Sequence, residues 1–61
     1  MKKYYITAFD RSGSPLLNEM FEASDDSEAQ NIGLKRLSEK QLLHHPSRIV
    51  RSSGSLLYFH Q

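Results

Sequence analysis

Residues 24–37, with the sequence SDDSEAQNIGLKRL, decide the fold because they contain the strongest helix signal of the chain. Asp25 and Glu28 have the spacing of a capping box, which places the start of a helix near Asp25. The residues that follow at i, i+3, i+4 and i+8 share one face of that helix: Ala29, Ile32, Gly33 and Leu37. Small residues at two of these positions favour a close approach to a sheet. We therefore predict one helix that packs on a sheet.

The predicted helix ends between Lys40 and Leu43, because His45 precedes Pro46 and a residue before proline disfavours the α region. Arg36 lies at the edge of the apolar face, so its charged head should extend to solvent. Two leucines, Leu34 and Leu42, lie off that face. We expect them to be exposed, and they are the first candidates for a partner surface.

Two apolar segments precede the helix, residues 3–9 and 16–23, and both have the β-branched and aromatic composition of strands. The turn between them has a clear mechanism: Asp10 can accept hydrogen bonds from its own backbone, Gly13 can adopt a positive φ, and Pro15 suits a strand edge. A β-hairpin is therefore predicted. In its second strand we favour the side of Phe21 and Ala23 as the inner one, although Met20 on the opposite side could serve the core equally well.

A second hairpin follows the helix, with strands at residues 47–52 and 56–59 and a turn of small residues at 52–55. The predicted fold class is therefore α+β in the order β-β-α-β-β. One mostly antiparallel four-stranded sheet would carry the helix on one face, and residues 1–61 would form a single small domain. Two strand orders fit this pattern. The first and last strands could lie together in the centre, in a grasp-like arrangement, or the strands could form a simple meander.

One face of such a sheet has no helix to cover it. The apolar residues that compete for this face are Tyr5, Thr7, Phe9, Leu16, Met20 and one of the pair Leu56 and Leu57. A chain of 61 residues without cysteine has a small core and no disulfide, so self-association is a route to stability. We expect a protein-interaction module that binds itself, as a homodimer, or an unknown protein. It would bind through a sheet edge or through the uncovered face. Tyr5 and Phe9 join the two exposed leucines as candidate contacts.

The charge distribution supports an alternative. The net charge is only +1, but residues 1–31 carry −3 and residues 32–61 carry +4. Acidic residues at the start of a helix and basic residues at its end also favour the helix dipole, which explains much of this asymmetry. The alternative function is weak RNA or DNA binding by the basic C-terminal half, and its candidate contacts are Lys35, Arg36, Lys40, Arg48 and Arg51. Arg48 and Arg51 differ in parity, so an unbroken strand would point them to opposite faces.

No pattern in the chain indicates catalysis or a cofactor. The serines occupy turns and caps, and no strand-turn-helix nucleophile elbow is present. His44, His45 and His60 lack the spacing of a metal site, and the three glycines are too isolated for a phosphate loop. We therefore expect no enzyme activity, metal, cofactor or small-molecule substrate.

The N-terminal pair Lys2 and Lys3 precedes an apolar run that is too short for a signal peptide, and no run approaches the length of a membrane span. We expect a cytoplasmic bacterial protein that does not contact a membrane.

Three segments together resemble one known family: FDRSG at residues 9–13, FEASDDSEAQNIGLKRL at 21–37 and LLYFH at 56–60. They are similar to the YhzD-like proteins, short uncharacterised chains of Bacillus-type bacteria, and the resemblance extends over nearly the whole chain. It implies a cytosolic bacterial protein and transfers no functional residues.

Overall fold

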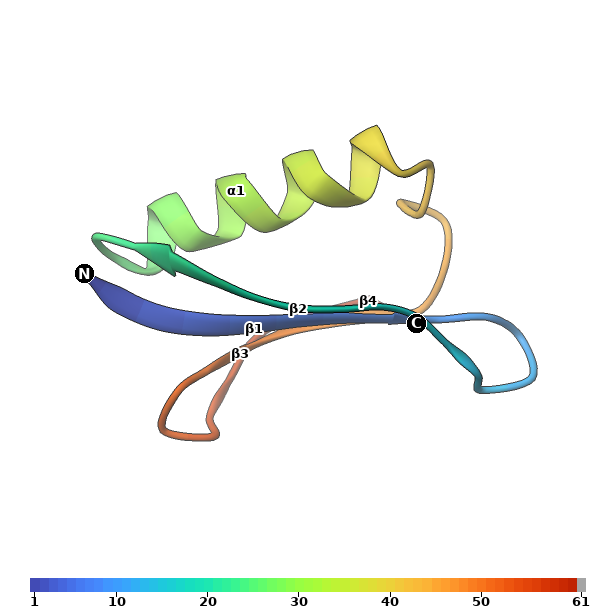
Figure 1. The fold of residues 1–61 in the computed structure, drawn as a ribbon, viewed down its shortest axis with the longest axis horizontal. Coiled ribbons are helices and arrows are strands. Elements are labelled where there is room, and N and C mark those ends of the chain that lie inside the picture. Colours follow the sequence, from blue (N-terminus) through green and yellow to red (C-terminus); the bar gives the residue numbers. More distant parts are fainter. Residues whose placement is uncertain (61) are drawn as a thin grey trace.

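Four antiparallel strands form one sheet, and a single helix lies along one side of it in the computed structural model, which describes residues 1–60 (Figure 1). The elements follow in the order β1 (Lys2–Phe9), β2 (Pro15–Ala23), α1 (Asp26–Glu39), β3 (Ser47–Arg51) and β4 (Leu56–His60). The predicted α+β class and the element order β-β-α-β-β are confirmed.

The strand order is β2-β1-β3-β4, which differs from both predicted orders. After α1 the chain re-enters the sheet beside the end of β1, where the Phe9 amide donates to the Pro46 carbonyl at 2.8 Å. β3 then pairs with β1, from Ala8 opposite Ser47 to Tyr4 opposite Arg51. Because the second hairpin is tight, β4 follows as an outer strand. β2 and β3 thus run in the same direction on either side of β1, and α1 is their crossover connection.

The core lies between the sheet and α1. Its buried apolar residues are Tyr4, Ile6 and Ala8 of β1, Leu17, Phe21 and Ala23 of β2, Ala29 and Leu37 of α1, and Ile49 of β3. The predicted inner side of the second strand is therefore confirmed. Tyr4 and Phe21 stack with ring centroids 5.7 Å apart, which packs β1 against β2 on this side.

The first hairpin turn is held by one carboxylate. The Asp10 Oδ1 atom accepts hydrogen bonds from the Ser12 and Ser14 amides, each at 2.9 Å, and from the Ser12 hydroxyl at 2.6 Å. Gly13 has φ of 92°, a conformation that few other residues adopt without strain. Pro15 opens the edge strand β2, where its missing N–H does not interrupt the sheet. The predicted turn chemistry is confirmed.

The start of α1 has the predicted N-cap at Asp25, but the Glu28 side chain bonds to Ser24 instead of to the Asp25 amide. The Asp25 carboxylate accepts the Glu28 amide at 2.8 Å, as an N-cap should. The Glu28 carboxylate reaches past Asp25 and accepts from the amide and hydroxyl of Ser24, both at 3.0 Å. These bonds tie the end of β2 directly to the first turn of the helix.

The end of α1 forms a Schellman motif that the sequence analysis missed. Gln41 has φ of 59°, its amide donates to Ser38, and the Leu42 amide donates to Leu37 at 2.7 Å. This motif turns the chain back, so Leu42 is half-buried and packs against the core rather than being exposed. Leu34 is also half-buried against the core, because it lies three residues before the buried Leu37 on the same flank of the helix. The expectation that both leucines are exposed is wrong.

Gly33 of α1 packs directly against the two central strands. An ideal Cβ atom built there would overlap the δ-methyl group of Ile49 and would lie 3.5 Å from the δ-methyl group of Ile6. The absent side chain of Gly33 therefore gives the two central strands the space for their isoleucines. This packing explains a glycine in the middle of a helix, where it costs about 1 kcal/mol relative to alanine.

The fit between Gly33 and Ile49 predicts that Gly33→Ala lowers the free energy of unfolding in wild type and raises it in an Ile49→Val background. Gly33→Ala gains about 1 kcal/mol of helix propensity, but overpacking costs about 1–3 kcal/mol, so the single variant should be less stable. In an Ile49→Val background the overlapping methyl is gone and leaves space into which the remaining γ-carbon, 3.2 Å from the built Cβ, can shift, so the same substitution should raise stability by up to about 1 kcal/mol. Denaturant unfolding of the four proteins measures this double-mutant cycle. Equal destabilisation in both backgrounds would contradict this packing.

Candidate functional site

The face of the sheet opposite α1 carries an apolar row that crosses all four strands. In the strand register Met20 of β2 lies opposite Tyr5 of β1, Tyr5 lies opposite Val50 of β3, and Val50 lies opposite Leu56 of β4. We call these four residues the cross-sheet row. Figure 1 shows the sheet edge-on, with α1 on one side and no element packed on the other.

A β-bulge in β4 brings a second exposed apolar residue onto this uncovered face. The register passes from Tyr58 opposite Ile49 to Leu56 opposite Val50, so Leu57 is the extra residue. Leu56 and Phe59 therefore share the uncovered face although they are three positions apart. Strict alternation along the strand would have separated them.

The side chains of this face are unusually exposed for their type. The exposed fractions are 44% for Tyr5, 49% for Met20, 54% for Leu56 and 56% for Phe59, whereas Ile6 and Ile49 on the other face are fully buried. Leu16, at the bulge between β1 and β2, is also exposed. Single exposed apolar residues are ordinary, but a contiguous set indicates an interaction surface.

Two of the four residues expected to contact a partner lie on this face. Tyr5 is in the cross-sheet row, and Phe9 is a half-buried neighbour whose ring lies under the Arg48 guanidinium at 5.7 Å. Leu34 and Leu42 lie on the helix side. Val50 and Phe59 were not among the residues expected to contact a protein partner, because their face depends on the strand order and on the bulge at Leu57.

The five cations expected to contact nucleic acid do not form one surface. Lys35 and Lys40 are exposed on α1 and its C-cap, and Arg36 pairs with Glu19 at 3.1 Å with its guanidinium over Phe21. Arg48 points to the uncovered face and Arg51 to the helix side, as their parity predicted. Arg36 and Arg51 are thus already engaged in intramolecular ion pairs.

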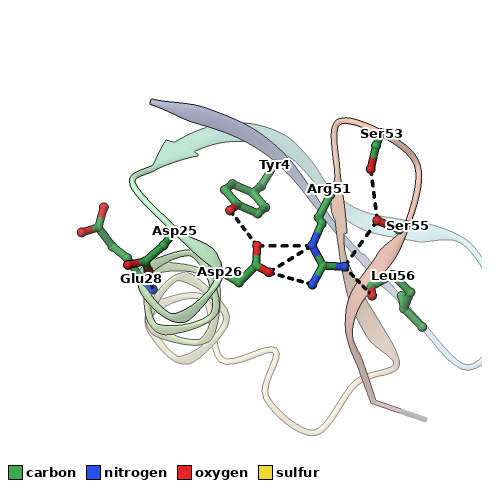
Figure 2. A network of polar contacts seen from close by, with 8 residues as sticks. All are labelled: Tyr4, Asp25, Asp26, Glu28, Arg51, Ser53, Ser55 and Leu56. Atoms are coloured by element: carbon green, nitrogen blue, oxygen red, sulfur yellow. Dashed lines mark hydrogen bonds and ion pairs between the residues drawn. The ribbon is translucent and has the colours of Figure 1, made fainter.

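A polar network joins the first turn of α1 to the two central strands (Figure 2). Asp26 accepts the Tyr4 hydroxyl at 2.9 Å and is paired with Arg51, whose Nη2 atom lies 2.8 Å from its carboxylate. Arg51 also donates to the Leu56 carbonyl at 3.0 Å. One carboxylate and one guanidinium therefore connect β1, α1, β3 and the start of β4. Asp26 is one of the acidic residues at the helix start that the helix dipole favours, and Arg51 is one of the expected nucleic-acid contacts, so the sequence does not predict that they pair.

The network shifts the pKa of each member in the direction that preserves it. Hydrogen bonds from Arg51 and Tyr4 lower the pKa of Asp26 below its ordinary 3.8. Burial, followed by the hydrogen bond to Asp26, raises the pKa of Tyr4 above its ordinary 10.0. The hydrogen bonds to the Asp26 carboxylate also raise the pKa of Arg51. At neutral pH the carboxylate is therefore ionised, the phenol is neutral and the guanidinium is charged.

A half-open cavity of about 200 Å³ lies beside this network, between Lys2, Lys3, Arg51, Ser52 and Ser53. It is smaller than the roughly 300–1,000 Å³ of ordinary small-molecule sites. His44 and His45 lie in the turn that follows α1, and His60 ends β4. Among residues 1–60, no three histidine or acidic side chains are grouped so that they could hold a metal ion.

The helix of the described part of the chain is too short and too polar to cross a membrane.

The fold and surface of residues 1–60 define a class: a small α+β domain with one four-stranded antiparallel sheet, one helix and one uncovered face. The chain belongs to the YhzD-like family, whose model, described as "YhzD-like protein", matches residues 1–61. It is 43% identical over 61 residues to "Uncharacterized protein YhzD" from Bacillus subtilis (strain 168), and the match covers all of both chains. No solved structure matches the chain. The predicted family resemblance is confirmed.

The network predicts an acid-dependent contribution to stability from Asp26. Because its folded-state pKa is lowered, the contribution is present above the ordinary carboxyl pKa of 3.8 and is lost as pH falls through the folded-state pKa. Wild type should therefore be more stable than Asp26→Asn at pH 7, and the difference should shrink as pH falls toward 2. Thermal unfolding across this range measures it.

The matched control for this experiment removes the partners instead of the carboxylate. In a Tyr4→Phe/Arg51→Met background the pH dependence that Asp26 contributes should largely disappear, while that of Asp10, whose pKa its own turn lowers, remains. An unchanged effect of Asp26→Asn in this background would show that the network does not stabilise the fold.

Proposed function

We propose that this protein is a small protein-interaction module that acts through the uncovered face of its sheet, by binding itself or another protein. The observation that carries the proposal is the cross-sheet row, which runs uninterrupted from one edge strand to the other. Burial of apolar surface contributes about 25 cal/mol per Å². A partner that covers the half-exposed side chains of this row would therefore gain binding free energy from their burial. A cytoplasmic location is part of this proposal.

The way the chain distributes its charges supports the same function. Arg36 and Arg51 pair with Glu19 and Asp26 on the helix side. On the uncovered face Arg48 lies next to aromatic rings, while Lys3 and Glu22 are cross-strand partners at one end. The centre of the face is thus apolar with polar groups around it, which is the arrangement of a protein interface with a polar rim.

The second candidate function is weak binding of single-stranded RNA or DNA. It is supported by Arg48, which lies opposite the exposed Phe59 and over the Phe9 ring on an open sheet. Aromatic rings beside a cation can stack bases. This function predicts binding that weakens steeply with salt and is lost when nucleic acid is removed.

One capture experiment separates these functions. Tagged wild type, Tyr5→Lys and Leu43→Lys would each be recovered from bacterial lysate that also contains the untagged chain, with and without nuclease. Leu43 is the matched control, because it is 40% exposed but lies in the turn after α1. Both variants add the same charge. Wild type and Leu43→Lys should retain a nuclease-resistant protein, either the untagged chain or another, and Tyr5→Lys should lose it.

Two results would contradict the interaction module. Equal recovery by Tyr5→Lys would show that the uncovered face does not bind. Loss of every captured protein on nuclease treatment would show that capture depends on nucleic acid, and would support nucleic-acid binding instead.

A further inference from the structure

We infer that the occupant of the uncovered face is a second copy of the same chain, packed face to face about a two-fold axis that runs parallel to the strands. The inference rests on the proposed function and specifies its partner. It is argued from the size of the face, its charges and the shapes of the residues in the cross-sheet row.

The face is large enough for a dimer of modest affinity. The Cα atoms extend 33 Å along the longest axis and 16 Å along the shortest. Figure 1 looks down the shortest axis and meets the sheet edge-on, so these two lengths bound the sheet face. Each face is therefore at most roughly 500 Å², and two of them would bury at most about 1,000 Å² together, which is the size range of weak complexes. Such an interface should give a dimer in the micromolar to submillimolar range.

The charges of the face suit a copy of itself better than a strongly acidic or basic partner. Lys3 and Glu22 offset each other across β1 and β2 at one end. Arg48, nearer the other end, has its guanidinium over Phe9 and so lies beside the row rather than in it. A two-fold axis parallel to the strands places Arg48 of one copy over Thr7 of the other, because Thr7 and Arg48 are cross-strand neighbours. No charge then meets a like charge directly.

The residues of the row fit this axis by size. The axis exchanges the two central strands and the two edge strands, so Tyr5 of one copy faces Val50 of the other, and Met20 faces Leu56. A large side chain then meets a smaller one at the centre, as packed layers require. An axis along the row would instead place Tyr5 on Tyr5 and Val50 on Val50. The two tyrosines would then be overpacked, and the two valines would leave a gap. Aligned sheets of this kind pack about 10 Å apart.

Pairing of two β4 edges is the competing way to join two copies. β4 has five residues without charge or proline, so only its short length and its bulge at Leu57 protect its outer edge against pairing. Edge pairing, however, would leave Tyr5 and Met20 exposed, whereas face-to-face packing covers the whole row. Tyr5 lies two strands from β4, so its substitution distinguishes the two arrangements.

The test is sedimentation equilibrium of the purified chain from micromolar to millimolar concentration. Wild type and Leu43→Lys should dimerise alike, and Tyr5→Lys should dimerise at least tenfold more weakly, since the two-fold axis repeats each lysine. Circular dichroism and thermal unfolding verify that the variants are folded, and Met20→Lys provides a second variant of the row. Because the chain has no cysteine, Met20→Cys and Leu56→Cys can then report the axis by disulfide formation.

Each result decides the inference. A dimer that Tyr5→Lys weakens, with preferential disulfides between Met20→Cys and Leu56→Cys, supports it. A monomer at millimolar concentration overturns it, and so does a dimer that Tyr5→Lys leaves intact. Disulfides of each cysteine variant with itself alone overturn the strand-parallel axis. If the chain is monomeric but the capture experiment retains another protein that Tyr5→Lys loses, the proposed function stands while this inference fails.

Discussion

The contact between Gly33 and Ile49 sets how close the helix can approach the sheet, and the rest of the structure depends on it. With no side chain at Gly33, α1 packs directly on the isoleucines of the two central strands. The one helix of the described chain therefore buries the central apolar residues on one side of the sheet. Because a sheet has two faces and this helix covers one, the opposite apolar residues remain in solvent. The tight packing on one side and the exposed row on the other are two results of the same arrangement.

The polar network defines the orientation of that helix. Asp26 holds Tyr4 and Arg51 at the first turn, and the Schellman motif at Leu42 fixes the last turn against the core. Two cations of the basic half form ion pairs on the helix side, Arg51 with Asp26 and Arg36 with Glu19. The charge asymmetry along the sequence thus contributes to internal structure, and the face without the helix is left mostly apolar. An apolar face on a stable scaffold favours association with protein.

The sequence predicted the elements well because their signals are local. The capping residues Asp25 and Glu28, the turn at Asp10 and Gly13, and the inner position of Phe21 each depend on neighbours within a few residues. The strand order could not be predicted, because both of the expected orders and the observed one satisfy the same apolar pattern. It depends on where the chain re-enters the sheet at Pro46. Leu42 was assigned wrongly because Gln41, instead of the usual glycine, adopts the left-handed conformation that ends the helix.

The candidate surface was predicted in part for the same reason. Alternation placed Tyr5 and Met20 among the residues that compete for the uncovered side, but the side of Leu56 and Phe59 depends on a bulge at Leu57, which has no sequence signal. The ion pair of Asp26 with Arg51 joins residues 25 positions apart, so no local pattern reveals it.

The most direct measurement for this account is nuclear magnetic relaxation by a soluble paramagnetic cosolute, recorded residue by residue in dilute and concentrated protein. The account predicts that Ile6 and Leu37 are protected at both concentrations, and that Tyr5, Val50 and Leu56 are relaxed strongly in dilute protein and become protected in concentrated protein. Leu43 should remain accessible throughout. Relaxation of the cross-sheet row that does not change with concentration, or protection that appears on α1 instead, would contradict the claim that the uncovered face is where this protein binds its own copy.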